Sequence, residues 1–501
     1  MVRKEVVLVA GLATVYLWFD HYGHTFIPAN ESIRLYAAQA VVDHGALSLD
    51  PVLAAHGVRN LDQAEFEGHA YLDKAPGLSL AAIPFYALGT RLGLPGDRAH
   101  LPLWLALLTG LLVAIPGAFG CLLVRRTVLQ LGGSDWSATA AALTLGLATP
   151  FALYSTLFFG HGPAAVLAAA TLWAATANRP ALAGACAGAM VLVETQTALL
   201  AVALLWPLTQ LGPRSLLRGA LGALPFAAVQ LAYNAALFEG PLDFAYAHKS
   251  AEAFQAVHGS GLFGIGLPSY SALLELTLGA HRGLLVHAPV LLGAAAAVTR
   301  RAARLPLAAF LIQLTVIAGF SDWAGGDAWG PRHLVPALPA VAVAFGLGLD
   351  RLGAPARGVL AALAGASALG AWLPIATFPY AMAAIPAPLA QLGWSLASQL
   401  QLAPSQLGAS PIVGLIGLSG VALLPALLLA PRRWLAPAAV GALAFAGILA
   451  WVPPAKGPAA KARDLTDCLM DRPDAAAARC FSPGVWSDKR CQCQIPKGPG
   501  P

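Results

Sequence analysis

Apolar runs of about 20 residues, separated by short polar segments, recur along the first 450 or so residues of the chain. About 20 apolar residues in a helix cross the hydrocarbon core of a bilayer. The pattern therefore predicts an all-α polytopic membrane protein with thirteen spans, within a range of eleven to thirteen. The expected spans are residues 5–21, 101–124, 137–157, 161–177, 181–212 (two short helices), 217–236, 283–299, 305–320, 333–349, 358–374, 411–430 and 434–452.

The basic residues orient these spans, because Lys and Arg concentrate in cytoplasmic segments. Arg3 and Lys4 place the N-terminus in the cytoplasm. No small-residue cleavage site follows the first span, so we expect it to be retained and not removed as a signal peptide. Residues 76–92 are expected to form an interfacial or re-entrant helix, because a full crossing would put Arg125 and Arg126 outside.

Composition supports a membrane location for most of the chain. Hydrophobic residues make up 58% of it and charged residues 11%, whereas soluble domains carry about 25% charged residues. The net charge of +6 comes from basic residues scattered in pairs between apolar runs. Cytoplasmic orientation and anionic lipid explain that scatter better than nucleic-acid binding does, so no nucleic-acid partner is expected.

The first outer loop, residues 22–100, carries an unusual concentration of acidic residues. Eight of the 24 Asp and Glu of the chain lie between Asp20 and Tyr86, together with Arg34, Arg59 and Lys74. A polar loop held on apolar spans is where we expect chemistry. The eight acids are Asp20, Glu31, Asp43, Asp50, Asp62, Glu65, Glu67 and Asp73.

Four stretches of this chain carry a family resemblance. They read NESIRLYAAQAVVDHGALSLDP from Asn30, GHAYLDKAPGLSLAAIPFYALG from Gly68, GAHRGLLVHAPVLL at 279–292 and WAGGDAWGPRHLVPALP at 323–339. In order and spacing they resemble the GT-C superfamily of membrane glycosyltransferases, especially bacterial relatives of protein O-mannosyltransferases and aminoarabinose transferases. The resemblance covers most of residues 1–350. Where the family commonly has an Asp-Glu pair after the first span, this chain has Asn30-Glu31.

The resemblance implies a GT-C-like bundle with interfacial helices in its first outer loop. It also implies an enzyme of the bacterial inner membrane that moves a sugar from a polyprenyl-phosphate-linked donor to a lipid, glycan or protein acceptor on the periplasmic face. Such a transfer needs a base for the acceptor proton and cations for the departing phosphate. We expect Glu31, in a loop just outside the first span, to be the base, ahead of Asp20 and Asp43. Lys74, Arg332 and Arg282 are the candidate phosphate-binding residues.

Five further residues are candidates for lining the outer cavity. Glu194 interrupts an apolar run, and charge at membrane depth is costly unless it is paired or functional. The structural alternatives are a helix-capping role for Glu31, a snorkelling Lys74, and an ion pair between Glu194 and an Arg. No metal ligands are predicted, and the need for a divalent metal is left open. The five candidates are Asp73, His161, Glu194, Tyr246 and His248.

Two other functions remain open at this stage. A transporter of lipids or solutes would also be polytopic, but polar residues should then follow several helices at mid-membrane depth. In this chain they gather at the expected outer ends. A catalytically inactive scaffold would differ only at the acidic residues, and Asn30 keeps that alternative open. The sequence does not identify the sugar or the acceptor.

The residues after Val452 differ in composition from the membrane domain, residues 1–452. The tail, residues 453–501, is expected on the outer face and contains Cys468, Cys480, Cys491 and Cys493 but no His. Zinc is not favoured by this set, whereas an even number of cysteines on an oxidising face favours disulfides. Cys121 and Cys186 lie inside apolar runs and are expected to be packing residues.

We predict at least one disulfide among the four tail cysteines. Freshly isolated, non-reduced protein treated with an alkylating reagent under denaturing conditions should leave at least two of them unmodified, as read by mass spectrometry. Cys121 and Cys186, the expected packing residues, serve as internal controls for complete alkylation. Modification of all four tail cysteines without prior reduction would contradict the prediction.

Overall fold

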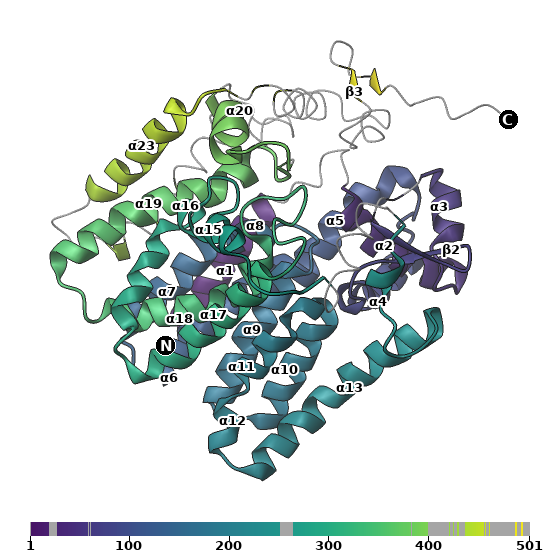
Figure 1. Ribbon diagram of the computed structural model, residues 1–501, viewed down its shortest axis with the longest axis horizontal. Coiled ribbons are helices and arrows are strands. Elements are labelled where there is room, and N and C mark those ends of the chain that lie inside the picture. Colours follow the sequence, from purple (N-terminus) through teal and green to yellow (C-terminus); the bar gives the residue numbers. More distant parts are fainter. Residues whose placement is uncertain are drawn as a thin grey trace.

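The structure is a computed structural model, and it describes residues 2–19, 28–58, 60, 62–250, 264–381, 383–398, most of 436–454 and a few short pieces between 420 and 493. The expected span at 411–430 and the tail cysteines lie almost wholly outside these residues. The described part is predominantly helical, with two short antiparallel hairpins. Helices pack side by side into a bundle, and a smaller group of elements lies at one side of it (Figure 1).

Helices coincide with most of the expected spans in the described part of the chain. The span expected at 137–157 is wrong in its second half, because α7 ends at Leu147 and only the short α8 (Phe151–Tyr154) follows. Five of them are apolar over at least 18 residues, which is long enough to cross a membrane. The continuous spans correspond to α1 (Val2–Trp18), α5 (Leu101–Thr109) joined to α6 (Ile115–Gln130), α7 (Asp135–Leu147), α9 (His161–Thr176), α13 (Pro213–Leu237), α17 (Arg304–Ala318), α18 (Leu338–Leu349), α19 (Ala354–Ala376) and α23 (Ala436–Trp451).

The expected break at Glu194 is present. Helix α10 (Pro180–Val193) ends there, Glu194 itself is extended, and a short 3₁₀ turn leads into α11 (Ala198–Leu204). The segment expected as span 283–299 is also interrupted, since α16 (Leu284–His287) is followed by a 3₁₀ helix at Pro289–Ala297. Both interruptions put non-helical backbone inside protein, the one setting in which lipid-spanning segments tolerate it.

The first outer loop folds into a compact subdomain beside the bundle (Figure 1). Its elements are α2 (Ala29–His44), α3 (Asp50–His56), the hairpin β1 (Gln63–Phe66) and β2 (His69–Leu72), and α4 (Gly77–Arg91). The hairpin turns through Glu67 and Gly68, both with positive φ, as a two-residue turn requires. Helix α4, the expected interfacial helix, packs on α2 and exposes Phe85 and Leu88 on its other side.

The second outer loop expected from the sequence, residues 239–282, docks on this subdomain through its described first part, residues 239–250. The backbone N–H of Ser250 donates to the carbonyl oxygen of Gln63 at 3.1 Å, and Lys249 forms a β-bridge with Ala64. The loop segment therefore adds to the edge of the hairpin. This contact carries Lys249, together with Tyr246 from the preceding 3₁₀ turn Ala245–His248, toward the bundle.

Polar contacts join the basic segments at one end of the bundle. The Glu5 carboxylate accepts hydrogen bonds from Arg125 (3.1 Å) and Arg126 (2.8 Å). Asp350 accepts from the side chain and backbone of Ser134, and Arg300 donates to the carbonyl oxygen of Leu347 at 2.7 Å. The N-terminal helix and these basic turns thus share one side of the molecule, as the orientation inferred from the sequence requires.

We predict that this basic end faces the cytoplasm. In protein whose six native cysteines are replaced by serine, a cysteine at Ala302, between the basic residues of that end, should resist an impermeant thiol reagent in intact cells. A cysteine at the exposed Glu239 of the second outer loop should react and serves as the matched outer control. Labelling at position 302 without labelling at 239 would reverse the orientation.

Candidate functional site

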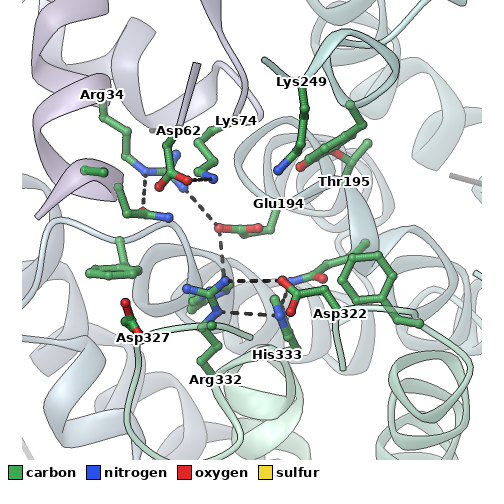
Figure 2. Close-up of a pocket in the computed structure, with 18 of the residues that line it drawn as sticks. Arg34, Asp62, Lys74, Glu194, Thr195, Lys249, Asp322, Asp327, Arg332 and His333 are labelled. Atoms are coloured by element: carbon green, nitrogen blue, oxygen red, sulfur yellow. Dashed lines mark hydrogen bonds and ion pairs between the residues drawn. The ribbon is translucent and has the colours of Figure 1, made fainter. Parts of the chain in front are cut away.

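A cavity of about 260 Å³ lies at the end of the bundle opposite the basic network. The segment Arg332–Leu349 runs from this cavity to Asp350 in that network, which fixes the two ends. Charged side chains from several elements converge on the cavity (Figure 2). Its charged lining residues are Arg34, Lys74, Lys249 and Arg332 on the basic side and Asp62, Glu194, Asp322 and Asp327 on the acidic side.

Two lysines from different outer loops share one buried carboxylate. The Nζ atoms of Lys74 and Lys249 lie 3.2 and 3.1 Å from Oδ2 of Asp73, which is almost fully buried behind the cavity wall. Lys74 also contacts Asp62 at 3.2 Å. Asp73 therefore holds the first and second outer loops together and fixes both ammonium groups at the cavity surface.

The local charges set the protonation states of these lysines. Burial alone would lower the pKa of Lys74, but the carboxylates of Asp62 and Asp73 raise it above its ordinary value. Burial and the neighbouring charge of Lys74 lower the pKa of Lys249. Burial would raise the pKa of Asp62, and the surrounding cations, Lys74 first, lower it instead. Lys74 is therefore positively charged at neutral pH.

Arg332 enters the cavity from the third outer loop expected from the sequence, residues 321–333. Three glycines of that loop, Gly325, Gly326 and Gly330, have positive φ, which few side chains tolerate. A Cβ on Gly325 would lie 2.6 Å from Nε of Arg332, so this glycine makes room for the guanidinium. Nη2 of Arg332 lies 3.9 Å from Asp322, and its Nε donates to Nε2 of His333 at 3.5 Å. Its charge is therefore weakly paired among the described residues.

Arg282 lies behind the third outer loop and not among the residues that line the cavity. Its guanidinium is fully buried and donates to the backbone carbonyl oxygens of Gly326 and Ala328. Burial lowers the pKa of Arg282 to about 10. The structure therefore places this candidate phosphate ligand as an anchor of the loop that carries Arg332 and Asp327.

Glu31 lies in the first turn of α2 and not in a loop, because the helix already begins at Ala29. Its side chain is fully buried, and it is absent from the residues lining the cavity. Oε1 accepts a hydrogen bond from the backbone N–H of Phe158 at 2.7 Å, and Oε2 accepts one from the hydroxyl of Tyr380 at 2.8 Å. Both carboxylate oxygens are thus engaged in holding the cavity wall.

Glu194 faces the cavity from the break after α10 (Figure 2). Its Oε1 lies 3.5 Å from Nη2 of Arg34 and 3.5 Å from Nδ1 of His161. All three side chains are buried. Nη1 of Arg34 has no hydrogen-bond partner among the residues that the structure describes. The ion pair expected between Glu194 and an Arg is therefore present, and it lies on the cavity wall.

Aromatic and amide side chains complete the wall. The Tyr246 ring lies 5.6 Å from Nζ of Lys249, within range for a cation–π interaction. Gln196 contacts Nδ1 of His333 at 2.8 Å, and both line the cavity. Aromatic faces and amides of this kind are common partners of sugar rings and hydroxyls. His248 instead lies outside the lining set, where it pairs with Asp243 at 2.8 Å.

The structure thus gathers Lys74, Arg332, His161, Glu194 and Tyr246 around one cavity and puts the other sequence candidates behind it. Sequence reasoning did not single out several of the lining residues. Arg34 had a signal, since it lies one helical turn after Asn30 on the same face. Asp327 and His333 belong to the stretch quoted at 323–339, and Asp62 is one of the acids noted in the first outer loop, although none was proposed for the cavity. The remaining three carry no distinctive motif and lie in loops or short turns: Gln196, Asp322 and Tyr380.

The described part of the chain contains no preformed metal site. No group of three or more His, Cys, Asp or Glu side chains there has a geometry that could hold a metal ion. The positive charges that face the cavity belong to the lysine and arginine side chains named above. Such an arrangement can bind an anionic group by lysine and arginine and can offer a carboxylate next to it.

Comparison with known proteins gives results only at the level of the fold. No protein-family model and no curated protein sequence matches the chain. Among solved structures, ArnT from Cupriavidus metallidurans bound to undecaprenyl phosphate is 18% identical with a TM-score of 0.50, over 89% of this chain and 75% of that one. The Archaeoglobus fulgidus oligosaccharyltransferase in its apo form is 12% identical with a TM-score of 0.39, over 99% and 61%.

The likeness to ArnT covers 89% of this chain. Its identity is too low to transfer an activity, but it agrees with the helical architecture described above and with the order of the sequence motifs. The resemblance inferred from those motifs is therefore confirmed for the fold. The chain is a multi-pass membrane protein with the fold of the GT-C superfamily of glycosyltransferases.

Proposed function

We propose that this protein is a membrane glycosyltransferase that uses a polyprenyl-phosphate-linked sugar and works on the periplasmic face of a bacterial inner membrane. The observation that carries the proposal is the cavity at the outer end, where Lys74, Lys249 and Arg332 converge beside the Glu194 carboxylate. A solved protein of the same fold, ArnT, holds undecaprenyl phosphate. These features support a lipid-phosphate donor and do not identify the sugar or the acceptor.

The phosphate of the donor is proposed to bind between Lys74 and Arg332. Lys74 lies at the start of α4, the expected interfacial helix, at the depth of lipid headgroups. Arg332 offers a planar fork of donors that suits phosphate oxygens. As the bond between sugar and phosphate breaks, negative charge grows on the leaving oxygen, and fixed cations there stabilise the transition state. Lys249 lies next to Lys74 and extends this cationic surface.

The proton of the acceptor hydroxyl or amine needs a base in the same cavity. Glu31, the base expected from the sequence, and Glu194 are the two candidates. Attack by the acceptor on the face opposite the phosphate would invert the anomeric centre in a single displacement. A transporter is a weaker alternative, because the charged groups gather at one end of the bundle around a single cavity in the described part of the chain.

We predict that Lys74→Ala and Arg332→Ala each weaken binding of undecaprenyl phosphate by about tenfold to a hundredfold. Loss of one hydrogen bond to a charged group costs about 1.5–3 kcal/mol, and 1.4 kcal/mol is about a factor of ten. Lys249→Ala should weaken binding less, because the phosphate is proposed to lie between Lys74 and Arg332, and Lys249 is paired with Asp73 at 3.1 Å beside that site. Affinity is measured in nanodiscs by native mass spectrometry or microscale thermophoresis.

The matched control is Arg91→Ala, which removes an exposed cation at the far end of α4. It should leave the affinity within about twofold of the wild-type value, well below the effect expected for lost phosphate contacts. Wild-type affinity in both Lys74→Ala and Arg332→Ala would remove the proposed phosphate site. Undetectable binding of undecaprenyl phosphate to the wild-type protein would argue against a polyprenyl-phosphate donor altogether.

A further inference from the structure

Two buried glutamates approach the cavity region, and only one of them offers an oxygen to it. Both oxygens of Glu31 accept hydrogen bonds, from Phe158 and Tyr380, and its side chain does not line the cavity. Glu194 lines the cavity, and its contacts to described residues are made by Oε1 alone. Oε2 of Glu194 has no partner among the described residues, so it has a lone pair to offer to a bound molecule.

The backbone around Glu194 holds its carboxylate in place. Its carbonyl oxygen accepts hydrogen bonds from the N–H and the hydroxyl of Thr197, at 3.0 and 2.7 Å, which fix the turn after α10. The carboxylate lies directly on Gly160, where an added Cβ would stand 2.2 Å from Oε1. Only a glycine leaves this space, so the side chain is seated on the start of α9 and directed toward the cavity.

We propose that Glu194 accepts the proton of the acceptor in the transfer reaction, and that Glu31 is a positioning residue. This assignment rests on the proposed function, because it names the base of that reaction. A general base must reach the proton that it removes at hydrogen-bond distance, and Glu194 meets that condition from the cavity wall. Glu31 acts through Tyr380 and the Phe158 backbone, which it holds against α2.

The step balances as a single displacement. A lone pair of the acceptor oxygen or nitrogen forms the bond to the anomeric carbon. The bond from that carbon to the phosphate oxygen breaks, and its electron pair leaves with the polyprenyl phosphate. The acceptor proton moves to Oε2 of Glu194. The phosphate product stays beside Lys74 and Arg332, and no oxidant, reductant or further reactant is needed.

Arg34 has a defined part in this arrangement. Nη2 contacts Oε1 of Glu194 at 3.5 Å, so the positive charge favours the ionised carboxylate, the form that can act as a base. It also leaves Oε2 as the oxygen turned to the substrate. The charged and titratable groups that face Glu194 in the described part of the chain are Arg34 from α2, His161 from α9, Lys74 from the first outer loop, Tyr246 from the second, and Arg332 and His333 from the third.

Measurements of turnover distinguish the proposed roles of Glu194 and Glu31. Release of undecaprenyl phosphate is followed for a panel of undecaprenyl-phosphate-linked monosaccharides, with bacterial membrane lipids supplied as acceptors. Glu194→Gln should lower the rate by about 10²–10⁴-fold, the usual worth of a general base, with undecaprenyl phosphate binding retained. Its rate should also lose the rise with pH that ionisation of a base produces. Glu31→Gln should melt at a lower temperature, lose less than about tenfold in rate, and keep that rise with pH.

The matched control is Glu239→Gln, which removes an exposed carboxylate from the second outer loop and should leave rate and pH profile unchanged. Wild-type turnover in Glu194→Gln would overturn the proposal. So would a Glu31→Gln variant that melts like the wild type but has lost both its turnover and the rise with pH, since a positioning role does not predict that combination.

A labelling experiment tests the same assignment without turnover. A small carbodiimide with an amine should modify Glu194 in the folded protein in nanodiscs, and undecaprenyl phosphate should protect it. Glu31 should stay unmodified, because both of its oxygens are buried and engaged. Modification of Glu31 in preference to Glu194 would overturn the assignment. If undecaprenyl phosphate does not bind at all, the donor class fails, while the labelling pattern still reports which acid faces the cavity.

Discussion

The pair of hydrogen bonds to the Glu31 carboxylate connects three parts of the molecule that are far apart in sequence. Phe158 precedes α9, Tyr380 follows α19, and Glu31 belongs to the first turn of α2. A buried charge is costly unless hydrogen bonds satisfy it, so these segments must meet for the fold to be stable. Their meeting closes the wall between the bundle and the first outer loop. Asn30 and Arg34, which line the cavity from the same helix as Glu31, depend on that wall for their position.

The clustering of charge in the cavity follows from the same cost of burying charge, applied to many side chains. Helices surrounded by lipid leave few places for charge, and charged side chains at one end must find partners or water. Here four cations and four carboxylates line one small space, and most of them are paired with each other. An incoming phosphate can therefore exchange partners with Asp62 or Asp322 without leaving a cation bare. Such prearranged groups need little reorganisation when charge moves during a reaction.

Local sequence patterns predicted the spans and the residues within motifs, whereas contacts between residues far apart in the sequence were not predicted. The length of the apolar runs predicted the spans. The interruption at Glu194 predicted the end of a helix, and an arginine, Arg34, does pair with that glutamate. Lys74 and Arg332 were found because motifs surround them. Glu31 was expected in a loop and open to substrate, yet a helix starts before it and tertiary contacts bury it. No local pattern could show that Asp73 contacts both Lys74 and Lys249. The two lysines are 175 residues apart in the sequence, and Lys249 is brought to Asp73 by the pairing of its segment with the hairpin edge.

The docking of the second outer loop on the hairpin of the first has a consequence for biogenesis. Lys249 reaches Asp73 only after Ser250 and its neighbours have paired with Gln63 and Ala64. During synthesis the first outer loop is complete well before residue 250 leaves the ribosome. Until then this edge of the hairpin lacks residues 249–250, and Asp73 lacks one of its two cations. The nascent chain therefore carries an incomplete subdomain with an exposed β-edge, which is open to pairing with other strands until the second loop docks.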